Sequence, residues 1–261
     1  MKKEYLIIGG VLVLLYYLTK NLGKNTQQEI PSGDNPTPQK DSISKIKRME
    51  NLLYIDKICR EGWGITSKAA RIGILCTIGK ESNFEPKFEK GYSLTPNERI
   101  REVFPTKCGK LTDEKLNYLK ANDERWFNFI YATTVGNRPG TNDGFKYRGS
   151  GFNQLTGRGN YEKYGKLVGR DLLSYPELNN TLEVATQTML HFMNQGSGSA
   201  KGKAKLKAAG YSWVNSIDNV NWAIRFFCSI NSGNGSMTSD KVNKAYNNAL
   251  RYKQAVTNAI I

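Results

Sequence analysis

The chain contains few of the histidine and cysteine residues that form metal sites and catalytic cysteine sites. Histidine occurs once, at His191, and none of the four cysteines forms a CxxC pair. Zinc sites draw on closely spaced cysteine and histidine, so we expect neither a metal site nor a cofactor. Nothing around His191 or the cysteines resembles a nucleophile with its base, which makes cysteine catalysis a poor match. Cys76 lies in an apolar run and is predicted to be a buried free thiol, with a disulfide as the alternative.

Clusters of positive charge are also missing, although positive charge itself is abundant. The 261 residues include 38 lysines and arginines against 23 acidic residues, and no basic run reaches five residues. The formal charge of +15 attracts polyanions in general, such as nucleic acids, anionic lipid headgroups or bacterial wall polymers. No nucleic-acid-binding signature accompanies it, so no specific nucleic-acid partner is expected.

One long apolar segment is present near the N-terminus. Residues 5–18 (YLIIGGVLVLLYYL) contain no charge and have lysines on both flanks. The segment is short against the roughly 17–25 residues of a full span, but Tyr16 and Tyr17 suit a membrane interface. No small-residue cleavage site follows it, so residues 1–20 are expected to form an uncleaved membrane anchor. A cleaved signal peptide and an ordinary core helix are the alternatives, and the orientation stays open.

The rest of the chain divides into a linker and one domain. Residues 21–40 are rich in Asn, Gln, Gly, Pro and Ser and predict a flexible linker. From residue 41 to residue 261 apolar residues recur at helical spacing, and few segments alternate with period two, so any sheet is small. The first helix is expected to be capped by Asp41 or Ser42, and the next by Thr66 or Ser67. Further helices are expected near residues 96–103, 123–132, 161–168, 182–194, 220–230 and 239–258.

Two features of this domain suit work on sugars. Glu81 lies near the end of the apolar run IGILCTIGKES, and cleavage of a glycosidic bond needs a carboxylic acid that stays protonated. A glutamate near a helix end is more often a solvated surface residue. Residues 144–161 (GFKYRGSGFNQLTGRGNY) hold five glycines among amides, hydroxyls and aromatic rings. Glycines allow a backbone to approach a ligand closely, although a structural hairpin is the alternative; the spacing does not match a nucleotide site.

Several segments resemble glycoside hydrolase family 19, which includes chitinases and chitinase-like phage endolysins. The stretch YRGSGFNQLTGRGNYEKYGKLVGRDLLSYPEL resembles the family signature, usually YRGRG, an apolar pair and QLTGRxNY. IGKESNFEPKFEKGYS resembles the family's helix that ends in His-Glu-Ser, followed by a second glutamate before a Tyr-Ser turn. RIREVFP, NRPGTNDGFKYRG and SINSGNG resemble further segments in the family's order. The resemblance therefore runs from about Ser67 to Gly235.

The resemblance implies a lysozyme-like α+β fold that is mainly α, with residues 147–155 in a small β region lining a sugar-binding cleft. It also implies an inverting mechanism with Glu81 as general acid and Glu89 as general base, Glu85 being the runner-up. Thr156 would help hold the attacking water. The residues implied to bind the sugar or shape the cleft are Tyr147, Arg148, Gln154, Asn160 and Asn231.

Three residues depart from the family pattern. Lys80 stands where the family often has histidine, and a cation beside Glu81 would oppose its role as acid. Adjacent helix positions do not face each other, so Lys80 is expected to point away. Ser150 replaces an arginine and Asn153 an apolar residue, and these changes are expected to alter sugar binding.

The leading hypothesis is a membrane-anchored peptidoglycan hydrolase that cleaves β-1,4 glycosidic bonds by general acid/base catalysis. An anchor, a linker and a basic catalytic domain suit work at the bacterial cell envelope, in viral lysis or entry, with a virion membrane as a second location. The alternatives are a chitinase, a lytic transglycosylase, and a non-catalytic envelope protein that binds sugar.

Overall fold

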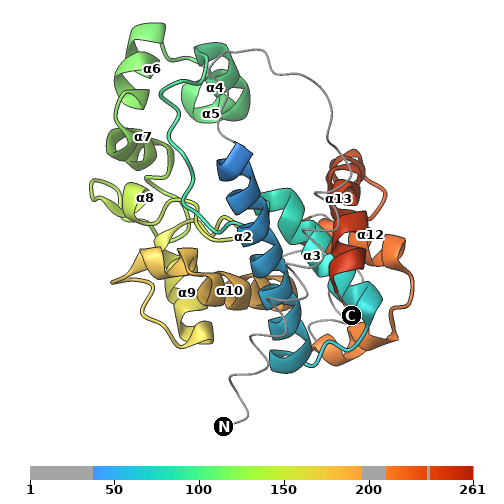
Figure 1. Cartoon of the computed structure of the whole chain (residues 1–261). Coiled ribbons are helices and arrows are strands. Elements are labelled where there is room, and N and C mark those ends of the chain that lie inside the picture. The colour runs from blue at the N-terminus through green and yellow to red at the C-terminus, as the bar shows by residue number, and fades with distance from the viewer. Residues whose placement is uncertain (1–37, 196–209, 234–235, 261) are drawn as a thin grey trace, which may run out of the picture. The chain divides into compact units, whose positions relative to one another are not determined.

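The computed structural model describes residues 38–195, 210–233 and 236–260. The chain divides into two units, Met1–Asp41 and Ser42–Ile261, and the helices that bear on function belong to the second. This unit is mainly helical (Figure 1). The larger helices are α2 (Pro38–Lys57), α3 (Lys68–Ser82), α9 (Arg158–Val168), α10 (Leu182–Gln195), α12 (Val220–Asn231) and α13 (Asp240–Ala259).

Short helices fill the connections. They are α4 (Asn97–Val103), α5 (Pro105–Cys108), α6 (Asp113–Lys120), α7 (Asp123–Ile130) and α8 (Asp143–Lys146). A π-helical turn, η1 (Ile58–Gly62), follows α2, and two 3-10 helices occur at η2 (Pro176–Asn180) and η3 (Gly210–Ser216).

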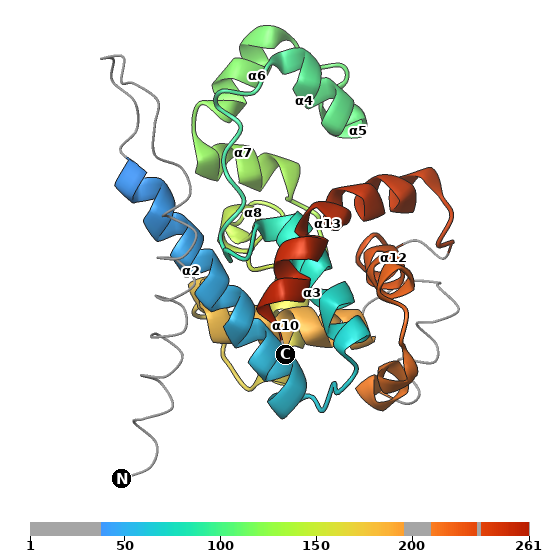
Figure 2. The same ribbon diagram turned by 45° about the vertical axis from the view of Figure 1, so that its right-hand side comes forward.

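Helix α3 is the centre of the largest hydrophobic core. Its sequence is apolar on nearly all sides, and almost every residue from Ala69 to Gly79 is buried, as expected for a helix enclosed by others. Helices α12 and α13 pack directly on it, as both views show (Figures 1 and 2). Gly73 allows this contact, because a Cβ there would lie 2.7 Å from the backbone carbon of Ala223. The two helices α3 and α12 therefore pack backbone to backbone at this point.

Two smaller cores flank this centre. One joins α4 to α7 around Trp126, Phe127 and Ile130, and these helices lie together in both views (Figures 1 and 2). The other lies around α9 and α10, where Tyr147, Leu155, Tyr161 and Tyr164 pack with their neighbours. The glycine-rich segment 144–161 enters this third core, so its aromatic residues support the fold.

Most predicted helices are confirmed, and Ser67 caps α3 as expected, because its Oγ accepts a hydrogen bond from the N–H of Ala70 at 3.0 Å. The cap predicted at Asp41 or Ser42 is wrong, since α2 begins at Pro38. Proline lacks an N–H and has a fixed φ, so it fits the first turn of a helix and allows this earlier start. The helices α5, α6 and α8 are not predicted by the sequence; α5 and α8 have only four residues each, too few to show an apolar period.

The expected β region is reduced to one antiparallel bridge. Ser150 and Leu155 exchange two backbone hydrogen bonds, of 3.2 and 2.8 Å, and no strand occurs in the part of the chain that the structure describes. Between them Gly151 and Gln154 have positive φ angles of 70° and 50°, which turn the backbone too sharply for pairing to extend. The segment is thus a tight loop.

Cys76 is a buried free thiol, as its apolar surroundings predict, and burial raises its pKa to about 12. The other three cysteines are buried free thiols too. Among residues 38–195, 210–233 and 236–260, no helix is long and apolar enough to cross a membrane. The predicted anchor over residues 5–18 lies outside the described residues, as does the predicted linker up to residue 37.

Candidate active site

Glu81 lies in the last turn of α3, at the edge of the largest core. The Asn231 amide nitrogen, from the last residue of α12, donates to Glu81 Oε1 at 2.6 Å. The Glu81 side chain is 28% exposed, so it remains open to a ligand. The close packing of α3 on α12 at Gly73 therefore brings together two candidate site residues that are far apart in sequence.

Lys80 also contacts Glu81, which corrects the expectation that it points away. Its Nζ forms an ion pair with the same Oε1 that accepts from Asn231. The long alkyl stem of lysine explains the contact, since it lets the ammonium group reach a neighbour that the Cβ direction does not face. Glu81 thus has a cation in direct contact in this structure.

Glu85, the alternative base, is engaged elsewhere. Arg48 Nε on α2 donates to Glu85 Oε1 at 2.9 Å, and the two side chains form an ion pair. The Glu85 carboxylate is therefore occupied by a side chain of α2. This contact favours Glu89 over Glu85 for the role of base.

Glu89 is held by two tyrosine hydroxyls and by a backbone contact. Tyr92 donates to Oε1 at 3.0 Å, Tyr131 donates to Oε2 at 2.8 Å, and the Glu89 N–H donates to the carbonyl of Gly149 at 2.7 Å. Burial, together with the nearby charge of Glu89, raises the pKa of both Tyr92 and Tyr131. The hydroxyls therefore stay protonated and keep donating to the carboxylate.

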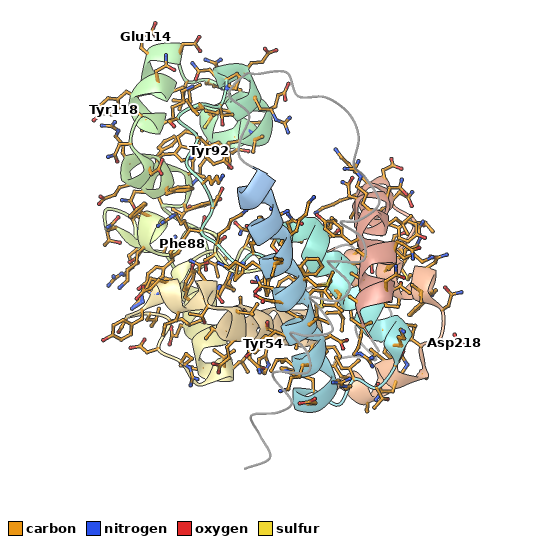
Figure 3. All side chains as sticks on the ribbon, viewed as in Figure 1. Tyr54, Phe88, Tyr92, Glu114, Tyr118 and Asp218 are labelled. Atoms are coloured by element: carbon orange, nitrogen blue, oxygen red, sulfur yellow. The ribbon has the colours of Figure 1, made fainter. Side chains whose placement is uncertain are left out.

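Both tyrosines were missed as site residues by sequence reasoning. Tyr92 belongs to the Tyr-Ser turn after Glu89, which was a usable signal. Tyr131 follows α7 and is 42 residues from Glu89, with no motif around it. Phe88 and Tyr92, which precede and follow Glu89 in the sequence, are labelled in Figure 3. Tyr92 lies among helices α4 to α7, and Phe88 lies nearer to α8.

Gly149 of the glycine-rich segment lies directly against Glu89. A Cβ at this position would lie 3.2 Å from Glu89 Oε2 and 2.8 Å from Gln154 Oε1. Any larger residue would therefore displace one of these side chains. This close approach joins the second glutamate to the segment that the sequence selected for sugar binding.

The remaining polar residues of the segment form a chain of short contacts. Gln154 Nε2 donates to the carbonyls of Gly151 at 3.2 Å and Lys87 at 3.3 Å. Thr156 Oγ1 donates to the Gln154 carbonyl at 2.8 Å, and Asn160 Nδ2 donates to the Thr156 carbonyl at 2.8 Å. A cavity of about 300 Å³ is lined by Thr134, Val135, Asn153, Gln154, Leu155, Thr156, Asn160, Lys163, Tyr164 and Phe192.

Tyr147 and Arg148 support the wall of this region. Tyr147 is buried, and its hydroxyl donates to the carbonyl of Leu173 at 3.1 Å. The Arg148 guanidinium lies over the rings of Phe88 at 4.1 Å and Phe145 at 4.2 Å, and burial lowers its pKa. Cation–π contacts of this kind fix a guanidinium in place.

The departures at positions 150 and 153 have different surroundings. Ser150 is fully buried and shares hydrogen bonds with the Tyr161 hydroxyl at 2.6 Å and the Asn179 amide at 2.8 Å. Ser150 thus links the glycine-rich segment to Tyr161 and Asn179, and its expected effect on sugar binding stays a prediction. The Asn153 amide is buried in the cavity wall, and neither of its polar atoms has a partner among the described residues.

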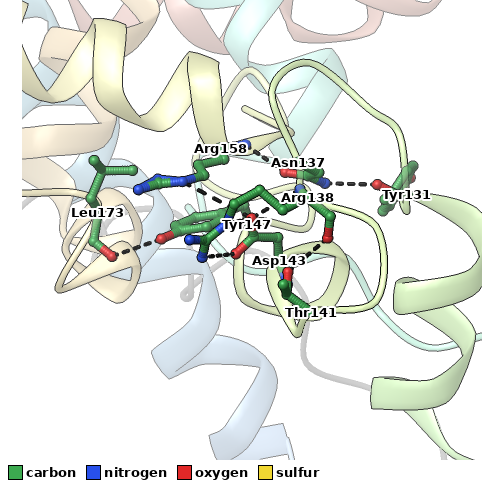
Figure 4. A network of polar contacts seen from close by, with 8 residues as sticks. All are labelled: Tyr131, Asn137, Arg138, Thr141, Asp143, Tyr147, Arg158 and Leu173. Carbon is green, nitrogen blue, oxygen red and sulfur yellow. Dashed lines mark hydrogen bonds and ion pairs between the residues drawn. The ribbon is translucent and has the colours of Figure 1, made fainter.

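A network of hydrogen bonds and ion pairs next to the glycine-rich segment contacts the backbone of Tyr131 (Figure 4). Asp143 is nearly fully buried and accepts from Arg138 Nε at 2.9 Å and Nη2 at 3.1 Å, and these bonds lower its pKa. The same loop presents Asn137, whose amide donates to the Tyr131 carbonyl at 2.7 Å and accepts from the Arg158 N–H at 2.7 Å. Sequence reasoning did not identify this network.

No protein-family model matches the chain. A curated protein of Haemophilus influenzae, described as a glycosyl hydrolase family 19 domain-containing protein, is 34% identical over 113 residues. The match covers 42% of this chain and 54% of that protein, so the chain spans about half the length of this relative. The similarity supports a family-19-like character at most, and a glycosidic substrate only loosely.

The structure thus brings the candidate residues into two groups. Glu81 and Asn231 lie together on the central helices. Glu89 lies with Gly149 and Gln154, to which Thr156 and Asn160 are joined through backbone carbonyls. Hydrolysis of a glycosidic bond requires a pair of carboxyl groups. The cavity lined by Gln154, Thr156 and Asn160 includes neither Glu81 nor Glu89 in its lining. That Glu81 and Glu89 face each other across a cleft stays a prediction.

Proposed function

We propose that this chain is a lysozyme-like glycoside hydrolase that cleaves β-1,4 bonds of peptidoglycan with inversion. The observation that carries the proposal is the direct approach of Glu89 to Gly149. It joins the second carboxylate to the segment rich in glycines and amides, while the first carboxylate meets the amide of Asn231. The partial similarity to the Haemophilus influenzae protein supports the same reaction class.

In the proposed reaction Glu81 donates its proton to the glycosidic oxygen as the bond to the anomeric carbon breaks. Glu89 takes a proton from a water molecule that attacks the same carbon from the opposite face. One water is consumed, and both carboxyl groups end in the opposite protonation state. The donated bonds from Tyr92 and Tyr131 hold the Glu89 carboxylate in a fixed orientation while it accepts that proton.

A second candidate is a non-catalytic sugar-binding protein, and the Lys80 contact favours it. The Lys80 ammonium group occupies Glu81 Oε1, an atom of the carboxyl group that would have to deliver a proton to the glycosidic oxygen. On the proposed hydrolase function, Lys80 must leave Glu81 when substrate binds.

Zymograms separate these functions. The full chain and its Glu81→Gln variant are run in gels that contain either peptidoglycan or chitin. Clearing of peptidoglycan by wild type alone supports the proposal, and clearing of chitin alone makes the chain a chitinase. Retained binding to peptidoglycan without clearing by either protein leaves the sugar-binding function.

Product analysis decides between hydrolysis and transglycosylation. A hydrolase releases reducing ends with inverted anomeric configuration, which proton NMR of fresh digests records. A lytic transglycosylase needs no water-activating base and leaves 1,6-anhydro ends, which mass spectrometry detects as a loss of water. Anhydro products would remove the proposed role of Glu89 while keeping that of Glu81.

The cellular setting is part of the proposal. Residues 5–18 would anchor the chain in a membrane at the bacterial envelope or in a virion, in viral lysis or entry. We expect the mature chain to keep its first 20 residues and to sediment with membranes. A mature N-terminus that begins after residue 20 would remove the anchor from the proposal.

A further inference from the structure

The segment that joins Glu81 to Glu89 leaves α3 through an unusual backbone. Asn83 and Phe84 both have positive φ angles, 53° and 61°. The left-handed region is unfavourable for a residue with a Cβ, and asparagine tolerates it better than a bulky residue such as phenylalanine. Two such residues in succession persist only where the surroundings hold them.

Helix α2 supplies the polar contacts that hold this segment. Asn51 Nδ2 donates to the carbonyl of Phe84 at 2.7 Å in a buried position. Arg48 Nε donates to Glu85 Oε1 at 2.9 Å. With the Asn83 amide oriented so that both its polar atoms are satisfied, its oxygen accepts from Arg48 Nη1 at 3.1 Å. Two side chains one turn apart on α2 therefore contact three consecutive residues, Asn83 to Glu85.

Helix α2 is itself firmly attached to the central core. Asp56 on α2 and Arg71 on α3 form an ion pair of 2.7 Å in which both side chains are almost completely buried. Leu52 and Ile55, which are also on α2, belong to the largest hydrophobic core. Because breaking a buried ion pair or a well-packed core face is costly, α2 offers a rigid support for the segment.

The other side of the segment is fixed by packing. The Phe84 ring is 4% exposed and meets the Tyr252 ring edge-on, with centroids 5.8 Å apart. Gly79 makes room for it, since a Cβ there would lie 2.9 Å from Phe84 Cζ and 2.8 Å from Tyr252. The segment is thus held between α2 and α13.

We propose that Arg48 and Asn51 are positioning residues that set the relative placement of Glu81 and Glu89. The inference rests on the proposed function, because only an acid/base pair needs that placement. Inversion requires the carboxyl groups roughly 6.5–9.5 Å apart with a water between them, and a misplacement of about 1 Å can lower the rate roughly a hundredfold. On this inference the two side chains act through residues 83–85 and not on the substrate, so their loss should lower kcat and leave KM nearly unchanged.

Arg48→Met and Asn51→Ala in the full chain test this role. Each should lower kcat on soluble peptidoglycan fragments roughly tenfold or more, with KM within about twofold of wild type. Arg48→Lys should recover part of the loss, because lysine keeps the charge but not the planar fork. Arg170→Met breaks an exposed arginine–glutamate pair elsewhere, with Glu183, and should leave kcat unchanged. A kcat equal to wild type in Arg48→Met would overturn the inference.

Asn83→Gly separates positioning from stability. Glycine relieves the left-handed strain at this position, so the Tm should stay level or rise, while the contact to Arg48 is lost. If the contact positions the carboxylates, kcat falls although the protein is no less stable. If activity in all these variants only follows Tm, the role is structural and the inference is wrong.

Amide hydrogen exchange keeps this test independent of the proposed function. If the wild-type chain does not hydrolyse peptidoglycan, the proposed function fails. The backbone amides of residues 82–85, 87 and 88 should still exchange faster in Arg48→Met than in wild type or Arg170→Met. Equal exchange in all three proteins would show that α2 does not hold the segment.

Discussion

The two candidate carboxylates, Glu81 and Glu89, lie in contrasting surroundings. Glu81 belongs to a buried helix, and its Oε1 meets one cation, Lys80, and one neutral amide, Asn231. Glu89 lies in the loop after α3, and its hydrogen-bond partners are all neutral: two tyrosine hydroxyls and a backbone carbonyl. One glutamate is placed by a rigid helix and the other by side chains that reach it from several elements.

The difference bears on how the two roles would be divided. The hydroxyls of Tyr92 and Tyr131 already hold the Glu89 carboxylate in one orientation. Glu81 Oε1, in contrast, is occupied by the Lys80 ammonium group. On the proposed function, Glu89 is in place in the free protein, whereas Glu81 must lose its contact with Lys80 when substrate binds.

The replacement Glu81→Gln should give the largest effect. An amide cannot donate the required proton, and loss of general acid catalysis lowers kcat on natural substrate by roughly a thousandfold or more. A chitooligosaccharide with a 2,4-dinitrophenyl leaving group needs no such proton, so Glu81→Gln should cleave it far better than it cleaves peptidoglycan. Equal losses on both substrates would contradict the acid role of Glu81.

Glu89→Gln should come next, with kcat lowered roughly a hundredfold or more because the water loses its base. In Glu89→Gln, unlike Glu81→Gln, kcat should fall as far on the dinitrophenyl substrate as on peptidoglycan, since a better leaving group does not activate water. Thr156→Val should cost less than Glu89→Gln, because it removes only a proposed contact to that water. If Glu89→Gln keeps full activity, the single-acid transglycosylase mechanism is favoured.

Asp143 provides a third carboxylate whose role is structural. Asp143→Asn should lower the free energy of unfolding by about 2 kcal/mol, as a buried group loses charged partners. Because Arg138 lowers the pKa of Asp143 in the folded protein, the contribution is complete above the unfolded pKa of about 4. It is lost as pH falls through the lower folded value. Denaturant unfolding from pH 7 to pH 2 should show this trend, with exposed Glu162→Gln as control.

Lys80→Met should change kcat without abolishing activity. The ion pair occupies Glu81 Oε1, and on the proposed function it must break when substrate binds. Its removal should raise kcat on peptidoglycan fragments by less than about fivefold, since a partly exposed ion pair contributes up to about 1 kcal/mol. Lys80→Arg keeps the ion pair and should stay near the wild-type kcat. An unchanged kcat in Lys80→Met would show that Lys80 has already left Glu81 in the working enzyme.

The tyrosines should also give small effects. Tyr131→Phe and Tyr92→Phe each remove one donor to Glu89 and should lower kcat by about three- to tenfold, since one such bond contributes about 1 kcal/mol. The double variant should approach the loss of Glu89→Gln if both hydroxyls are needed for orientation. No loss in either single variant would mean that Gly149 and the loop suffice to place Glu89.

Much of the fold could be predicted because local chemistry decides it. Ser67 caps α3 by accepting a hydrogen bond from the N–H of Ala70, three positions along the chain. The helices α10, α12 and α13 are predicted by apolar residues that recur at helical spacing. Glu81 followed from its place near the end of a buried apolar run. The bridge at Ser150 and the early start of α2 could not be predicted, because each depends on backbone angles that no residue period records.

The sequence by itself determined the helices and the buried thiol of Cys76. It also pointed to Glu81 and Glu89 as candidate catalytic residues, through the resemblance to glycoside hydrolase family 19. Only the tertiary structure decided what touches them. Asn231 reaches Glu81 across 150 positions, Tyr131 reaches Glu89 across 42, and Arg48 reaches Glu85 across 37. Such contacts depend on how closely segments pack: the helices α3 and α12 at Gly73, and the loops that carry Glu89 and Gly149, where an added Cβ would keep the partners apart. A periodic pattern specifies which face of a helix is buried, but the neighbour on that face is chosen by the packing of the whole domain.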